Sequence, residues 1–148
     1  MLKQNWISST YTDLNLSIDS PDALYRSPDS TINKLTFISS NKNLEINLIT
    51  KPINENSDLS NELINDFKER NFINVITKNE DFQTLDGDKG VKIFGSFDDQ
   101  NLNRKKDYST ILFVVNKLSI KLEIIYERGN ANLQKIVDRI INSLKFNK

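Results

Sequence analysis

The most constraining feature of the sequence is its C-terminal third, where two apolar stretches precede an amphipathic helix. Residues 111–115 are continuously apolar, and residues 118–126 are apolar with interleaved polar residues. After a turn at 127–130, the apolar residues that share one helical face are Leu133, Ile136, Val137, Ile140, Ile141 and Leu144. The two stretches predict strands that pair antiparallel across a short turn, and the helix must bury its apolar face against their sheet. This region indicates an α+β layer rather than an active site.

The upstream sequence predicts more strands and one further helix. Alternating apolar residues and turn signals place these strands at 14–18, 35–38, 44–48, 74–84 and 91–97. A helix with a narrow apolar stripe begins at Ser57 or Asp58 as N-cap and closes at Arg70 and Asn71. Loops are predicted at 20–33, 52–57 and 98–107. The expected fold class is therefore α+β, with an antiparallel sheet of about six or seven strands covered by helices.

The length of 148 residues fits a single domain, 1–148. Its polar start, residues 1–11, contains Trp6 and Tyr11 and predicts an N-terminal arm that docks by its aromatic side chains. With Tyr25 and Arg26, these aromatic residues either line a ligand crevice or pack over one end of the sheet, and packing is the favoured interpretation.

Composition excludes several classes of function. The 20 basic and 20 acidic residues give a formal net charge of zero, which disfavours nucleic acid and anionic membranes as partners. The chain has no His and no Cys, so the commonest general base, the commonest metal ligands and thiol nucleophiles are missing. We therefore predict no catalytic residues, no metal site and no cofactor. No apolar stretch approaches the roughly 20 residues of a membrane-spanning helix, and no signal peptide is visible.

Some local patterns imitate functional motifs. The segment 86–90 suggests a calcium loop but lacks the ligand spacing of an EF-hand. Ser39 and Lys42 have the spacing of a Ser-Lys acyltransferase, but they lie between predicted strands instead of opening a helix. We interpret both segments as turns. Glu123 and Glu127 share a strand face and are expected to face water.

The only basic cluster, Arg104, Lys105 and Lys106, is predicted to lie in a polar loop between two strands. Such a cluster can hold a phosphate or an acidic partner surface, although a solvated run of charge is the plainer interpretation. These three residues and Trp6 are the candidate binding residues.

With these elements in place, the sequence resembles the PsbP-like superfamily, which includes the Ran-binding Mog proteins and many small bacterial proteins. The resemblance rests on the strand from Tyr11 to Pro21, the helix 58–70, the Gly-bearing hairpin 87–97, and the strand 118–126 with a helix that ends near Ser143 and Phe146. It covers nearly the whole chain, but Asp22 follows Pro21 where family members often carry a Trp. The resemblance implies a PsbP-like α/β/α sandwich over 1–148 and a non-enzymatic accessory or binding role.

The main functional hypothesis is a bacterial binding module that engages a protein or an envelope component. Residues 4–6 resemble the mature start of exported family members, which implies a periplasmic or secreted location. Nucleic acid is not an expected partner, and membrane association would require a lipid anchor that this chain does not carry.

Two alternatives remain open. The first is a cytoplasmic dimeric chaperone for an apolar segment of a secreted effector, in which case Leu112 and Ile125 would line an exposed apolar groove, because they face away from the main apolar rows. The second is a His-free hydrolase or transferase that uses carboxylates or Lys.

Overall fold

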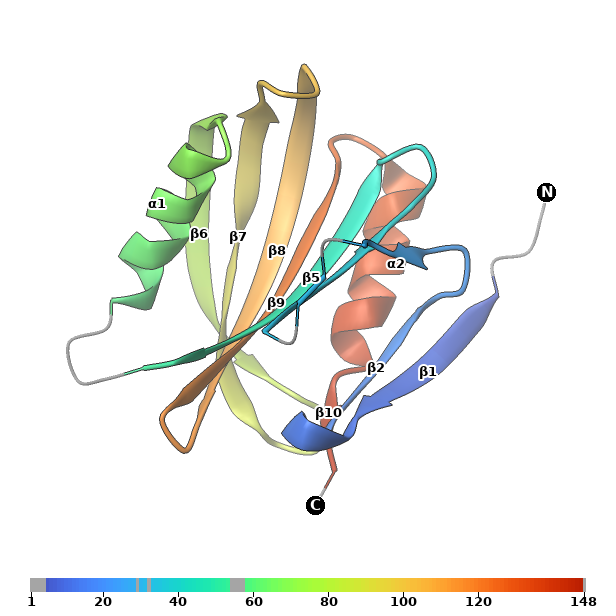
Figure 1. The fold of residues 1–148 in the computed structure, drawn as a ribbon, viewed down its shortest axis with the longest axis vertical. Coiled ribbons are helices and arrows are strands. Elements are labelled where there is room, and N and C mark those ends of the chain that lie inside the picture. Colours follow the sequence, from blue (N-terminus) through green and yellow to red (C-terminus); the bar gives the residue numbers. More distant parts are fainter. Residues whose placement is uncertain (1–4, 29, 32, 54–57, 148) are drawn as a thin grey trace.

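A seven-stranded antiparallel sheet forms the centre of the fold (Figure 1). The computed structural model describes residues 5–28, 30–31, 33–53 and 58–147. Across the sheet, the strands run in the order β3 (Tyr25–Arg26), β4 (Lys34–Ile38), β5 (Leu44–Pro52), β9 (Leu118–Glu127), β8 (Arg104–Val115), β7 (Lys89–Asp99) and β6 (Phe72–Gln83). All neighbouring strands in this sheet pair antiparallel.

The three hairpins predicted from turn signals are confirmed as β4–β5, β6–β7 and β8–β9. Asn116 and Lys117 form a two-residue turn with φ angles of 50° and 62°, the left-handed values that a type I′ turn requires. The Ser-x-x-Lys segment is a turn in which the Lys42 amide donates to the Ser39 carbonyl at 3.0 Å. The supposed calcium loop is the β6–β7 turn, where Gly87 supplies a φ of 94°.

The polar loop predicted at 98–107 is wrong, because only residues 100–103 separate β7 from β8. The charged ends of these strands lie in register with opposite charges facing one another. Asp98 pairs with Lys105, and Asp99 pairs with Arg104. This register avoids like charges across the ladder, and the two carboxylates contact Arg128 and the β7–β8 turn, so a segment that sequence polarity alone would assign to a loop forms a sheet.

A second layer covers one face of the main sheet. It consists of helix α2 (Ala131–Asn142) and a small sheet in which β2 (Leu16–Pro21) lies between β1 (Trp6–Tyr11) and β10 (Lys145–Phe146). Figure 1 shows α2 and the small sheet on the same side of the central strands. The N-cap of α2 is Asn130, whose side chain accepts a hydrogen bond from the Leu133 amide.

The N-terminal part differs from the predictions in three places. Residues 6–11 of the predicted arm form strand β1, while residues 1–4 lie outside the described part. Leu14 belongs to a short 3-10 turn, so the second strand starts at Leu16. The predicted loop at 20–33 contains the two-residue strand β3. Strands this short depend on tertiary pairing and give no periodic signal in the sequence.

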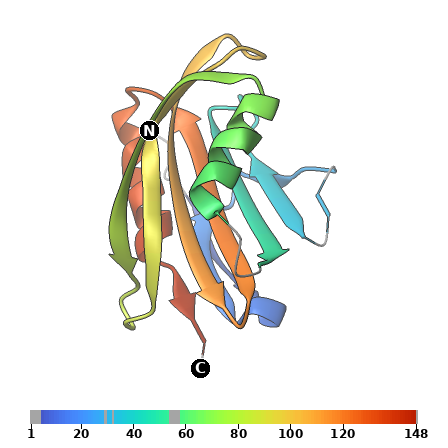
Figure 2. The same cartoon turned by 90° about the vertical axis from the view of Figure 1, so that its left-hand side faces the viewer.

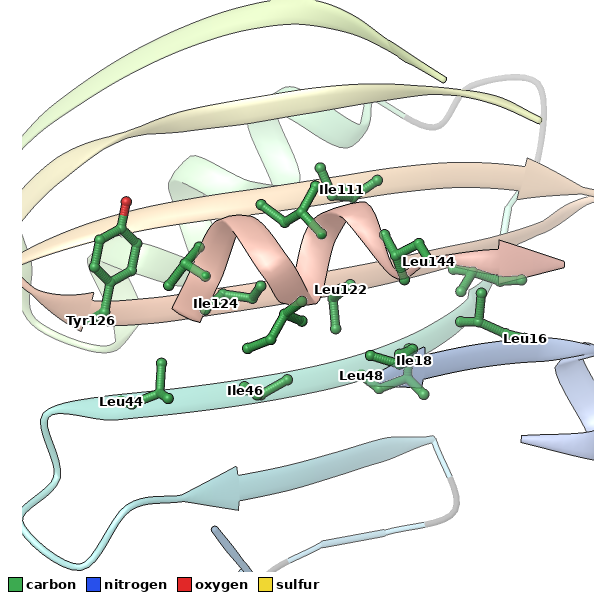
Figure 3. Close-up of a cluster of buried hydrophobic side chains, with 14 of the residues drawn as sticks. Leu16, Ile18, Leu44, Ile46, Leu48, Ile111, Leu122, Ile124, Tyr126 and Leu144 are labelled. Atoms are coloured by element: carbon green, nitrogen blue, oxygen red, sulfur yellow. The ribbon is translucent and has the colours of Figure 1, made fainter. Parts of the chain in front are cut away.

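The main hydrophobic core lies between the seven-stranded sheet and this second layer (Figure 3). Side chains from β2, β5, β8 and β9 meet the apolar face of α2 there. The labelled members are Leu16, Ile18, Leu44, Ile46, Leu48, Ile111, Leu122, Ile124, Tyr126 and Leu144. The predicted apolar face of the last helix is confirmed, since its residues pack in or against this core.

Helix α1 (Leu59–Glu69) covers the opposite face of the sheet (Figure 2). Its N-cap is Asp58, one of the two residues predicted, and the Asp58 carboxylate accepts from the Asn61 amide at 3.1 Å. Ser57, the other candidate, lies outside the described residues. Leu63 and Phe67 of α1 anchor a second core.

Leu112 and Ile125 are buried in this second core, with 7% and 5% of their surfaces exposed. They face away from the main apolar rows, as predicted, but α1 lies over them. The exposed apolar groove that the chaperone alternative requires at these residues is therefore not formed by them.

The result is an α+β sandwich with α1 on one face of the central sheet and α2 with the small sheet on the other, which confirms the predicted fold class. The described residues contain ten strands in two sheets. Six of the predicted strands lie in the central sheet together with β3, whereas the predicted strand at 14–18 corresponds to β2 of the small sheet. Neither α1 nor α2 has the length and apolar character needed to cross a lipid bilayer.

The β6–β7 pairing has an irregularity that requires a glycine. The register shifts between Ile73 and Ile76, and a Cβ at Gly95 would lie 1.8 Å from the Ile76 carbonyl oxygen. We expect Gly95→Ala to lower the free energy of unfolding by about 2 kcal/mol through overpacking, as measured by chemical denaturation. Gly129→Ala is the control, because Gly129 also has a positive φ but a Cβ there would meet no atom within 4 Å. Equal losses in the two variants would contradict this account.

Candidate functional site

The predicted basic cluster lies at one end of the central sheet, where three connections meet. These are the β4–β5 turn, the β7–β8 turn, and the segment after β9. Two adjacent hollows open there, and together they include all three residues of the basic cluster. Arg104, Lys105 and Lys106 are the first residues of β8, not part of a loop.

The first hollow has a volume of about 400 Å³ and is lined by Asn41, Asn43, Arg104, Lys105, Glu127 and Arg128. Arg104 and Lys105 are both exposed. The Arg104 guanidinium donates to the Asn41 carbonyl oxygen at 2.9 Å, which ties β8 to the β4–β5 turn. The Lys105 ammonium makes no ion pair with a described residue. Two exposed cations therefore rim this hollow.

Two acidic residues near these cations are already engaged, whereas Glu127 lies in the lining of the first hollow and is exposed. Asp98 lies 3.4 Å from the Arg128 guanidinium, which also lies 3.5 Å from Asp107. Asp99 accepts from the Asn101 amide at 3.0 Å and from the Leu102 amide at 3.2 Å, which fixes the β7–β8 turn. The positive charge of the rim is thus only partly matched within the chain.

The second hollow, about 350 Å³ in volume, lies between the C-terminus of α1 and the sheet. It is lined by Ile38, Lys42, Glu45, Arg70, Phe72, Asp99, Asn101, Leu102, Lys106 and Ile125. Lys106 is only 3% exposed, and its ammonium donates to the Lys42 carbonyl oxygen at 2.9 Å. Burial lowers the pKa of Lys106, and the neighbouring Arg104 lowers it further, while nearby acidic residues oppose the shift. Lys106 therefore belongs to the wall of the second hollow rather than to an accessible basic surface.

A charged cluster centred on Arg70 borders the second hollow. The Arg70 guanidinium lies 2.8 Å from Glu123, 3.0 Å from Asp66 and 3.2 Å from Glu45. It also lies over the Phe72 ring, 4.7 Å from its centroid. Burial alone would lower the pKa of Arg70, but Glu123 and Asp66 raise it above its ordinary value. The guanidinium therefore stays charged and holds α1 to the sheet.

The prediction that Glu123 faces water is wrong, since none of its surface is exposed, whereas Glu127 is exposed as predicted. Asn47 bridges two of the three carboxylates of the cluster, because its amide donates to Glu45 at 2.9 Å and to Glu123 at 3.0 Å. Arg70 and Asn47 occupy the space between these carboxylates. The arrangement is that of a structural ion cluster.

The candidate Trp6 does not line either hollow. Its ring lies under the Arg139 guanidinium, with 3.9 Å between the guanidinium carbon and the ring centroid, and packs against the main core. Tyr11 also packs against this core, whereas Tyr25 is 48% exposed. The interpretation that the N-terminal aromatic residues pack over the sheet therefore holds for Trp6 and Tyr11.

Sequence analysis did not identify Asn43, Arg70 or Arg128 as members of the site. Arg70 was interpreted only as a helix end, and Arg128 only as part of a turn. No local signal marks them, because α1 and the strand order bring them to the basic cluster. Within the described residues, no group of three or more His, Cys, Asp or Glu side chains could hold a metal ion.

Comparison with known proteins identifies the fold. The sequence matches no protein-family model, and no curated protein is significantly similar to it. The structure is similar to the Ran-binding protein Mog1p of Saccharomyces cerevisiae, with a TM-score of 0.61 and 11% identity over 97% of this chain and 96% of that one. It is also similar to cyanobacterial PsbP of Synechocystis, with a TM-score of 0.59 and 10% identity over 98% of this chain and 94% of that one.

Proposed function

We propose that this chain, which has the fold of Mog1p and PsbP, is a non-catalytic binding module that engages an acidic segment of a protein partner. The binding surface is the basic end of the central sheet, defined as Arg104, Lys105 and the first hollow beside them. The observation that carries the proposal is the pair of exposed cations on the rim of a concave surface that is also lined by Arg128, with Glu127 as the one acidic residue of its lining. Such a rim attracts a partner of opposite charge and fixes its orientation.

The structural likeness supports a protein as the ligand. Mog1p is described as a Ran-binding protein, so at least one protein with this fold binds another protein. Two adjoining open hollows at one end of the sheet also suit an extended peptide segment better than an enclosed small molecule. Glutamate or aspartate side chains of such a segment would pair with Arg104 and Lys105.

A periplasmic or secreted location belongs to the same proposal, and its support is the resemblance of residues 4–6 to the start of exported proteins. Fractionation of native cells tests it directly. Recovery of the chain with cytoplasmic markers alone would contradict export.

The chaperone alternative is less well supported by the structure. The groove that it requires at Leu112 and Ile125 is filled by α1. The enzyme alternative requires two carboxylates that share an enclosed pocket, and Arg70 and Asn47 separate Glu45 from Glu123.

The test is affinity capture from native soluble and envelope fractions with a double charge reversal, Arg104→Glu with Lys105→Glu. We expect the reversed chain to bind its partner at least about tenfold more weakly, because two attractive pairs become repulsive. Lys106 is left unchanged, because a carboxylate buried in its place would destabilise the fold. The wild-type interaction should also weaken as salt increases, since exposed charges are screened.

The matched control reverses Lys89 and Lys135, two exposed lysines away from the basic end. Lys89 lies at the opposite end of β7 from Asp99, and Lys135 lies on α2. This control should retain the partner. The proposal fails if both double variants capture the same proteins equally well, or if the wild-type chain captures none.

A further inference from the structure

β6 is the outer strand of the central sheet and pairs only with β7 among the described residues (Figure 2). It spans twelve residues, and most of its side chains are exposed. Ile76 is the clearest case, with 58% of its surface exposed. A long edge strand of this kind presents a row of unpaired backbone groups that another strand can join.

The register shows which backbone groups of β6 point outward. The Thr84 amide donates to the Asp88 carbonyl oxygen at 2.9 Å, so these two residues lie opposite one another as a hydrogen-bonded pair. Hydrogen-bonded pairs alternate along an antiparallel ladder. The backbone groups of even-numbered residues from 76 to 82 therefore face β7. Those of Thr77, Asn79 and Asp81 face outward.

A second copy of β6 fits this edge in one particular register. When two antiparallel copies are centred on Asn79, Lys78 of each lies opposite Glu80 of the other, and Ile76 lies opposite Phe82. These four residues share one face of β6 because side chains alternate along a strand. They also occupy the non-hydrogen-bonded positions, where opposing side chains approach most closely. Centring the pair one residue earlier or later opposes two Lys78 or two Glu80 side chains instead.

We propose that the protein forms a symmetric homodimer in which β6 pairs with β6 of a second copy, centred on Asn79, and joins the two central sheets into one. Bulges and charged residues often protect edge strands from pairing. In β6, however, the bulge is confined to Ile73–Ile76, and the charges that follow complement a second copy. Strand pairing alone buries less surface than a permanent interface, so dimerisation is weak and concentration-dependent.

The test compares dimerisation of single charge reversals by sedimentation equilibrium. Lys78→Glu and Glu80→Lys each place two like-charge pairs across the interface, and each should weaken dimerisation about tenfold. Mixing the two variants should restore dimerisation, because each contact between positions 78 and 80 in the heterodimer then joins a carboxylate to an ammonium. A double variant with both changes should also dimerise. Glu80→Lys removes the ion pair of Glu80 with Lys92, at 3.7 Å, so the mixture separates this local effect from the interface.

The lack of cysteine in the chain allows a second test. Asn79→Cys places two thiols across the symmetry axis, at a Cα separation of about 5.5 Å that a disulfide can span. Mild oxidation should give a covalent dimer of this variant and much less of Leu85→Cys, whose side chain is 90% exposed in the turn after β6. A wild-type chain that stays monomeric at millimolar concentration overturns the proposal. So does a dimer that survives both single reversals unchanged.

Discussion

Replacing Phe67 with alanine should lower the free energy of unfolding by about 4 kcal/mol, because the ring is fully buried and its removal leaves a cavity between α1 and the sheet. The ring centroid of Phe67 lies 4.9 Å from that of Tyr108, 5.2 Å from that of Phe97 and 5.4 Å from that of Phe72. These neighbours belong to β8, β7 and β6, so the Phe67 side chain packs α1 against three strands. Urea denaturation followed by circular dichroism measures the loss.

Phe94→Ala serves as the control for this prediction. Phe94 is half-buried on β7, so the same truncation there should cost only about 1 kcal/mol. Hydrogen exchange adds a local readout, since the amides of α1 should lose more protection than those of α2 in the Phe67 variant. Equal losses of stability in the two variants would show that the second core contributes little to holding α1.

The fold was predictable where its signals are local. The alternation at 44–48, the apolar run at 111–115 and the helical face from Leu133 to Leu144 all have the predicted structure, although Val114 and Val115 at the end of the apolar run are exposed. Strands β3 and β10 were missed because two residues carry no period. The ends of β7 and β8 were missed because their polar residues are held by pairing of the two strands and by the contacts of Asp98 with Arg128 and of Asp99 with the β7–β8 turn, which become visible only in the folded chain.

The candidate site was predictable only in part, because strand geometry rearranges a contiguous cluster. Arg104 and Lys106 share one face of β8, because side chains alternate along a strand, and both donate to carbonyl oxygens of the β4–β5 turn. Lys106 lies further into the strand and is buried in the wall of the second hollow, while Arg104 and Lys105 rim the first. The sequence locates the charge correctly, and the binding role of these residues stays a prediction.

Glu123 shows why long-range contacts limit such predictions. A carboxylate flanked by apolar residues on a strand is usually exposed, and the sequence around it contains no sign of a partner. Its partner is Arg70, 53 residues earlier, which reaches Glu123 only because Phe67 and Leu63 hold α1 against the sheet. The same helix covers Leu112 and Ile125. One packing event therefore explains both the buried charge and the missing groove.

Replacing Arg70 with methionine should lower the free energy of unfolding by about 3 kcal/mol, since it leaves Glu123 buried without its cation. Lys121, at 3.9 Å from Glu123, is too distant to replace the short contact with Arg70. Arg70→Lys should cost less than Arg70→Met, because it keeps a charge but loses the fork that contacts three carboxylates. Chemical denaturation at neutral pH provides the measurement.

A double-mutant cycle shows whether this loss comes from the Arg70–Glu123 pair itself. With Glu123→Gln in place, Arg70→Met should cost at least about 1 kcal/mol less than it does alone, because no buried charge is then left unmatched. Asp66→Asn is the control, since this carboxylate contacts Arg70 from an exposed position and should contribute about 0.5 kcal/mol. Strictly additive losses at Arg70 and Glu123 would mean that the ion pair does not hold α1 to the sheet. The position of α1 beside the basic end would then depend on the packing of the second core alone.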